Sequence, residues 1–144
     1  MAGRATTRRK RQWTPCSQQL RDRATKQLFF NMAVVKMRLQ GKPRCHTGIA
    51  KLRADDGSRC SLGWLITDKH YDPFFETRCP NEVMIDILGM PKLDYQFYDD
   101  LQDAHDKSAL RRGEWWDNFA KEMRKLATKH FLDPSSLTPP PASA

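Results

Sequence analysis

The hydrophobic pattern of residues 17–40 predicts a long amphipathic helix. Pro15 and Ser17 mark its start and Gly41, followed by Pro43, marks its end, because these residue types favour the first turn and the stop of a helix. Between them, apolar side chains recur at steps of three or four residues, the spacing of one helical face: Leu20, Ala24, Leu28, Met32, Val35 and Leu39. We expect this stripe, widened by Phe29 and Phe30, to pack on the domain core. The alternative is a partner-binding groove.

The next segment predicts a β-hairpin. Asp56-Gly57 lies between two runs that contain apolar residues, a strong short-range hairpin signal. Alternation on the second strand then buries Cys60 together with the apolar side chains that follow it: Leu62, Trp64 and Ile66. The alternative is that the chain turns helical after Cys60, since these positions nearly fit a helical period as well.

The second half of the chain predicts more helix. Asp72-Pro73 can start a helical element, and a short buried element over residues 83–88 stops at Gly89. Apolar spacing predicts two amphipathic helices, over residues 92–108 and 113–132. The expected fold class is α+β, a mostly helical single domain with one β-hairpin over residues 15–132. It lies between a disordered basic arm, residues 1–14, and a disordered Pro/Ser/Ala tail, residues 133–144.

Charge is unevenly distributed along the 144 residues. The net charge is +8, but residues 1–45 carry +11 and residues 46–144 carry −3. Clustered cations attract a polyanion, either nucleic acid or an acidic protein surface, although a merely solubilising surface is the alternative. No apolar run is long enough to span a membrane, and we expect a cytoplasmic protein whose four cysteines are reduced.

Two sets of charged residues are candidate contact sites. The first lies in the arm and the helix after it, where Trp13 can stack on a base or act as the first core residue: Arg4, Arg8, Arg9, Lys10, Arg11, Trp13, Arg21, Arg23, Lys26, Lys36 and Arg38. The second is an acidic partner face of Asp99, Asp103 and Asp106, which share one side of the helix predicted over residues 92–108. The alternatives for the acidic set are a solvated face, or carboxylates that hold a divalent metal.

The cysteines and histidines do not combine into a recognisable site. In a straight hairpin Cys45 lies on the order of 20 Å from Cys60, too far for a disulfide or a shared zinc ion. Cys79 is the more plausible exposed thiol, but no catalytic motif surrounds it. We therefore assign no catalytic, metal-ligating or cofactor-binding residue, and the role of Cys45 with His46 stays open.

Four phrases of the sequence resemble a known family. "MRLQGKPRC" precedes "DDGSRCSLGWLITDKHYDP", and "LQDAHDKS" precedes "WWDNFAKEMRKLA". Over roughly residues 17–130 this order is similar to a small, largely uncharacterised family encoded by tailed bacteriophages and some bacteria. Trp64 departs from that pattern, in which a small or sulfur-containing residue often follows the glycine. The resemblance implies a phage origin and no particular chemistry.

The sequence favours a binding function over catalysis. We expect a non-enzymatic phage accessory protein, active in the host bacterial cytoplasm, that binds and modulates a host macromolecular machine such as the transcription apparatus or a nuclease-based defence complex, in the main by inhibiting it. One alternative is a direct nucleic-acid-binding protein that uses its basic N-terminal third. Another is a small metal-dependent hydrolase or nuclease. The expected partners are a host protein complex, nucleic acid or both, with no membrane, cofactor or small-molecule substrate.

Overall fold

Seven helical elements follow one another along the part of the chain that the structure describes. The computed structural model describes residues 2–44, 52–93 and 96–138, with side chains from Gln18 onward in the first range. The elements are α1 (Ala2–Gln40), α2 (Ser61–Leu65), the 3-10 helix η1 (Pro73–Thr77), the π-helix η2 (Glu82–Ile87), α3 (Gln96–Leu110), α4 (Trp115–His130) and the 3-10 helix η3 (Ser135–Leu137).

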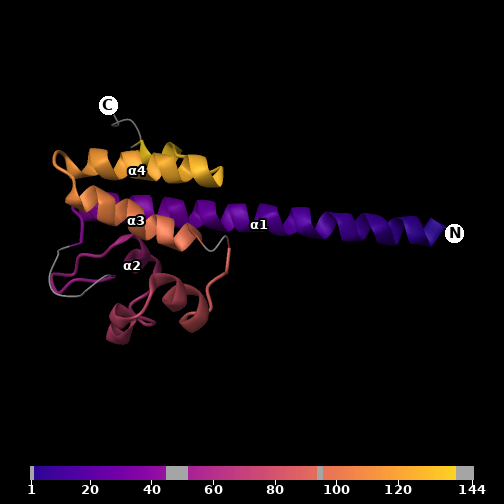
Figure 1. The fold of residues 1–144 in the computed structure, drawn as a ribbon, viewed down its shortest axis with the longest axis horizontal. Helices are drawn as coiled ribbons and strands as arrows, with labels where there is room; N and C mark the ends of the chain where they lie inside the picture. The colour runs from indigo at the N-terminus through magenta and orange to yellow at the C-terminus, as the bar shows by residue number, and fades with distance from the viewer. Residues whose placement is uncertain (1, 45–51, 94–95, 139–144) are drawn as a thin grey trace, which may run out of the picture.

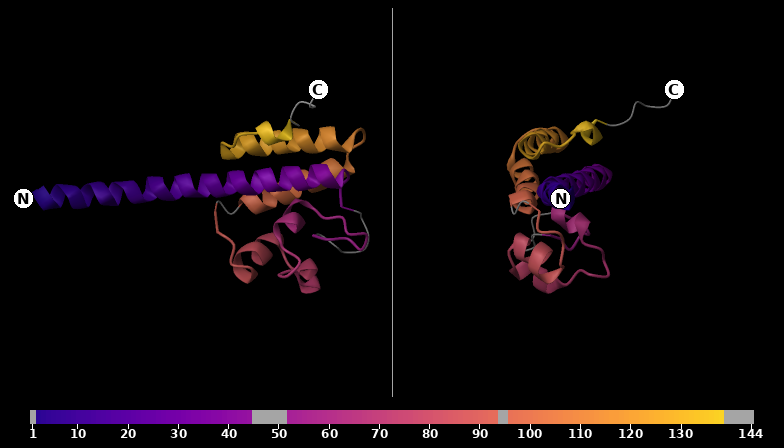
Figure 2. Two further views of the ribbon diagram at one scale, coloured as in Figure 1. Left: turned by 180° about the vertical axis from the view of Figure 1, so that it is seen from behind. Right: turned by 90° about the vertical axis from the view of Figure 1, so that its right-hand side faces the viewer.

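The helices form three layers. Helices α3 and α4 pack side by side as a pair, and the C-terminal half of α1 runs alongside them (Figures 1 and 2). The short elements α2, η1 and η2 lie on the side opposite α4. The N-terminal half of α1 extends well past all of these elements (Figure 1). The C-terminal half of α1 therefore contributes its side chains to the body of the fold.

The core lies where α1, α2, α3 and α4 meet. Phe30 and Met37 of α1 are fully buried with Leu62 of α2, Phe97 of α3 and Met123 of α4, all 0% exposed. Each such side chain contributes about 1.5–3 kcal/mol through burial. The core therefore joins segments from nearly the whole described chain.

The predicted β-hairpin is absent from the described residues. Its Asp-Gly turn is present, because Gly57 adopts φ 86° and donates a hydrogen bond to the carbonyl of Ala54 at 3.0 Å. Beyond the turn there is only an isolated bridge between Arg53 and Arg59. With no strand in the described ranges, the expected α+β class is wrong, and the fold is helical.

The reason for this difference lies at both ends of the bridge. Cys60 caps α2, since its Sγ accepts a hydrogen bond from the amide of Gly63 at 3.3 Å, and the chain turns helical instead of continuing as a strand. The amide of Leu52 donates to the Glu76 carboxylate at 3.0 Å instead of to a strand partner. A Cβ at Gly63 would collide with the carbonyl oxygen of Leu52, so α2 packs directly on this backbone. The helical alternative for residues 61–65 is thus confirmed.

The predicted helices of the second half are confirmed. Asp72 caps η1 through a 2.9 Å hydrogen bond from the amide of Phe74. Helix α4 falls within its predicted range, and α3 overlaps its own but ends two residues later, at Leu110. Residues 135–137, inside the segment expected to be a tail, form η3, and Leu137 is buried. Helix α1 begins at Ala2, inside the segment expected to be an arm, so the helix start predicted at Pro15 and Ser17 is wrong. Disorder of that arm stays a prediction.

Helix α1 has the length to cross a bilayer but not the composition. It is 39 residues long, and lysine and arginine residues interrupt its apolar positions in both halves. Within the described ranges, no helix combines the length and the apolar character of a membrane span.

Candidate partner-binding surface on α1

Helix α1 has two apolar faces, and of the stripe predicted to pack on the core the structure buries only Phe29 and Phe30. The buried face consists of Phe29, Phe30, Ala33, Val34 and Met37. The other positions of the predicted stripe face solvent, and four of them lie beside the body of the fold: Leu28 is 56% exposed, Met32 37%, Val35 44% and Leu39 77%. These four residues are called the α1 stripe below. The prediction that the α1 stripe packs on the core is wrong.

Two phenylalanines explain which face is buried. Phe29 and Phe30 occupy the space between α1 and its neighbours, and the Phe29 ring lies 6.3 Å from that of Tyr98 on α3. An aromatic side chain buries about 150–250 Å². Burying the face with two phenylalanines removes more apolar area from water than burying the aliphatic side chains opposite. The α1 stripe therefore stays exposed.

Trp64 borders the α1 stripe on one side. The Lys36 ammonium lies 5.6 Å from the centre of the Trp64 ring, and the Arg59 guanidinium lies 4.5 Å from it. The indole N–H donates to the side-chain carbonyl of Gln40 at 3.1 Å, which fixes the ring against the end of α1. A hollow of about 290 Å³ lies next to it, between Trp64 and Leu39.

Trp116 borders α1 on the other side. The Arg38 guanidinium lies 5.2 Å from the Trp116 ring and donates a short hydrogen bond to the carbonyl of Ser136. A second hollow, of about 270 Å³, is lined by Arg38, Gly41 and the two tryptophans that open α4. Tryptophan and arginine are enriched at the energetic centres of protein interfaces. The borders of the α1 stripe therefore have the composition of a binding surface.

The predicted basic contact residues do not share one face of α1. Arg21, Arg23 and Lys36 are exposed, whereas Lys26 and Arg38 are half-buried and turned toward other elements. The predicted arm contacts lie outside the described side chains: Arg4, Arg8, Arg9, Lys10, Arg11 and Trp13. The described part of α1 thus presents cations around its circumference.

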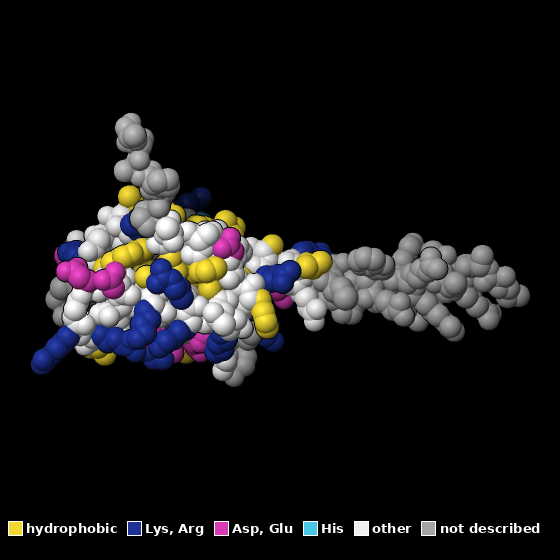
Figure 3. Space-filling model, turned by 90° about the horizontal axis from the view of Figure 1, so that it is seen from above, with side chains coloured by type: hydrophobic (Ala, Val, Ile, Leu, Met, Phe, Trp, Pro, Cys, Tyr) yellow, Lys and Arg dark blue, Asp and Glu magenta, His cyan; other side chains and the backbone are white. Residues whose placement is uncertain are grey.

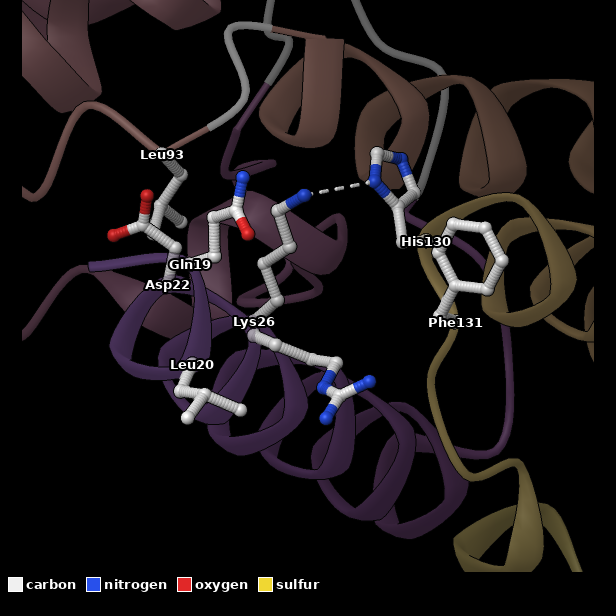
Figure 4. A pocket seen from close by; sticks show the side chains of 8 residues that line it. Gln19, Leu20, Asp22, Lys26, Leu93, His130 and Phe131 are labelled. Carbon is white, nitrogen blue, oxygen red and sulfur yellow. Dashed lines mark hydrogen bonds between the residues drawn. The ribbon is translucent and has the colours of Figure 1, made fainter. Parts of the chain in front are cut away.

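Lys26 takes part in a partly buried hydrogen-bond chain between α1, α4 and α3. Its Nζ lies 3.2 Å from Nδ1 of His130 (Figure 4). Nε2 of His130 lies 2.7 Å from Asp100 Oδ2. Because an ammonium can only donate, Nδ1 accepts and the Nε2 proton is donated to Asp100. Lys26 and His130 line a cavity of about 690 Å³. Leu20 and Phe131, which is 81% exposed, line it as well. Lys26 therefore links α1 to the α3 and α4 pair.

The three acidic candidates have different surroundings. Asp103 is exposed. Burial raises the pKa of Asp99, and the charges of Asp103 and Asp100 add to the shift. Burial alone would also raise the pKa of Asp106, but the hydrogen bond with His105 and the charge of Arg44 lower it. Asp106 lies 2.9 Å from His105 Nδ1, so this carboxylate also has a structural partner.

Cys60 is a packing residue, as predicted. Its side chain is 0% exposed and donates to the side-chain oxygen of Gln102 at 3.0 Å. Burial raises the pKa of the thiol to about 12, which leaves it protonated and a poor nucleophile. In the described part of the chain, no three His, Cys, Asp or Glu side chains converge as metal ligands. Cys45 and His46 lie outside the described residues.

A second basic surface was missed by the sequence analysis. Lys121 and Arg124 of α4 are exposed, as are Lys125 and Lys129, which pair with Glu122 and Asp100. Figure 3, which views the molecule from the α4 side, shows Lys and Arg side chains beside exposed hydrophobic ones. The net charge of −3 over residues 46–144 did not indicate this basic surface. A sum over the whole segment does not show that the cations of α4 lie on one face of the helix.

None of the family models, curated proteins and solved structures compared with the chain matches it. The resemblance to a phage family therefore stays a prediction.

Proposed function

We propose that this is a non-enzymatic binding protein that attaches to a partner protein through the α1 stripe. The observation that supports this most is the exposure of four large aliphatic side chains, at helical spacing, on a helix whose opposite face already fills the core. A contiguous apolar patch with polar borders is typical of an interaction site, whereas single exposed hydrophobic residues are ordinary.

The apolar area of the α1 stripe alone is too small to give a stable complex. Fully burying one aliphatic side chain contributes about 1.5–3 kcal/mol, and the four residues of the α1 stripe are exposed by 37–77%. Covering them therefore contributes about 4 kcal/mol in all, while association costs at least about 4 kcal/mol in lost freedom of movement. Net affinity requires the bordering tryptophans and cations as well.

The kind of partner is a further proposal. That it belongs to a host macromolecular machine, and that binding inhibits this machine in a phage-infected cell, is supported only by the sequence resemblance.

Affinity capture with matched variants tests the proposal. The bait is the full chain, the stripe variant Leu28→Gln/Leu39→Gln, or the control Leu110→Gln, whose residue is 77% exposed at the end of α3. All three should melt at similar temperatures, because exposed side chains contribute little to stability. We expect a protein captured by the wild type and the control to be lost from the stripe variant. Equal capture by all three baits would contradict the proposal.

Direct nucleic-acid binding is the second candidate, favoured by the extension of α1 past the body of the molecule (Figure 1). Arg21 and Arg23 of α1 are exposed, and five further cations precede them in the sequence. We expect a mobility shift of DNA or RNA that weakens with salt and after deletion of residues 2–12, with the logarithmic salt slope falling by at most about 0.9 per lost phosphate contact. No shift at low salt, or a shift that the deletion leaves unchanged, would contradict this candidate.

A further inference from the structure

We propose that the occupant of the α1 stripe is an acidic amphipathic helix of the partner protein. This inference rests on the proposed function and adds the chemistry of the partner. It follows from three features of the surface: the spacing of its apolar side chains, the sign of the charges at its borders and its area.

The spacing matches a helix. Leu28, Met32, Val35 and Leu39 follow one another at steps of four, three and four residues, which are the a and d positions of two coiled-coil heptads. At 1.5 Å per residue the seam is about 16 Å long, or three helical turns. A second helix with the same apolar period can place its side chains between them along the whole seam.

The borders are cationic. Lys36 and Arg38 flank the seam on its two sides, next to Trp64 and Trp116. Helix α1 contains no carboxylate after Asp22. The nearby Asp68 is held by Arg59 at 2.8 Å, and Asp56 by Lys42 at 2.9 Å. Glutamate or aspartate at the flanking positions of the incoming helix would meet these cations, as complementary flanking charges do in coiled coils.

A second copy of this chain fits the surface less well. Pairing two α1 stripes would bring two cationic borders together, and like charges across an interface are unfavourable. A stable interface also buries about 800 Å² on each partner, more than four partly exposed side chains provide. A nucleic acid has no apolar side chains to cover the seam.

Two synthetic helical peptides test the inference. Both have three heptads with leucine at a and d. One has glutamate at e and g, and the other has lysine there. Fluorescence anisotropy measures the affinity of each labelled peptide for the full-length protein. We expect the glutamate peptide to bind at least tenfold more tightly, and its affinity to fall at least tenfold in Leu28→Gln/Leu39→Gln and several-fold in Lys36→Gln. Leu110→Gln should leave it unchanged.

Several results would overturn the inference: equal affinity for the two peptides, no binding of either, or unchanged binding to the stripe variant. If the wild type is a dimer in light scattering and the stripe variant is a monomer, the occupant is a second copy of the chain.

Competition separates this inference from the proposed function. If capture of a partner depends on the α1 stripe but the glutamate peptide does not displace that partner, the proposed function holds and the acidic helix is wrong. If capture does not depend on the stripe, both are wrong.

Discussion

Replacing Phe30 and Leu39 with alanine, one at a time, tests which face of α1 belongs to the core. Phe30 is 0% exposed and Leu39 is 77% exposed. Truncating a buried phenylalanine to alanine costs about 3–5 kcal/mol, whereas truncating an exposed side chain changes stability by less than about 0.5 kcal/mol. Phe30→Ala should therefore destabilise the protein severely, and Leu39→Ala should have almost no effect.

Urea unfolding followed by circular dichroism measures the difference. With an m value of about 2 kcal/mol per M, a loss of about 4 kcal/mol lowers the midpoint by about 2 M. The midpoint of Leu39→Ala should stay within about 0.3 M of the wild type. A loss in Leu39→Ala as large as that in Phe30→Ala would show that the α1 stripe is part of the core and would refute the reasoning.

Three further predictions concern the interior and its edges. Alkylation of the native protein followed by peptide mapping should label the exposed Cys79 and leave Cys60 unlabelled until denaturant is added, because Cys60 is buried and the pKa of its thiol is raised to about 12. Glu76→Ala should destabilise the protein by about 1–3 kcal/mol in urea unfolding, since this carboxylate accepts the buried amide of Leu52 and the partly buried amide of Arg53. Tyr71→Phe, which removes one 3.1 Å hydrogen bond to the same carboxylate, should cost about 1 kcal/mol. The pKa of Asp106 is lowered in the fold, so the stability that this carboxylate contributes is present above its ordinary pKa of 3.8 and is lost as the pH falls below that value. Asp106→Asn should therefore flatten the acid side of a plot of unfolding free energy against pH. An unchanged plot would contradict this prediction.

The positions of most helices could be predicted from the sequence, because local signals set them, although α1 begins before the start that Pro15 and Ser17 predicted. Asp72-Pro73 at the start of η1 and Gly41 after α1 mark ends that the structure confirms. The Asp56-Gly57 turn is also local and is present. The strands around it were wrong because a β-ladder needs partners, and here Cys60 caps a helix while a distant carboxylate takes the amide of Leu52.

The faces of α1 could not be predicted in the same way. The helix carries two apolar sets at helical spacing, and the period alone cannot choose between them. The choice depends on what α2 and α3 present to α1, as the contact of Phe29 with Tyr98 illustrates. The pairing of Arg59 with Trp64 at the border of the site likewise depends on the turn that precedes α2. Which residues border the α1 stripe is therefore set by tertiary packing and could not be predicted from the sequence.

The affinity of a purified partner for the α1 stripe tests the central claim most directly. Titration calorimetry with the wild type, Leu28→Gln/Leu39→Gln and Leu110→Gln compares a change on the stripe with a change of equal chemistry at another exposed leucine. We predict that the stripe variant binds at least tenfold more weakly and that the Leu110→Gln control binds like the wild type. Equal affinities for the wild type and the stripe variant would show that the partner binds elsewhere and would contradict the account.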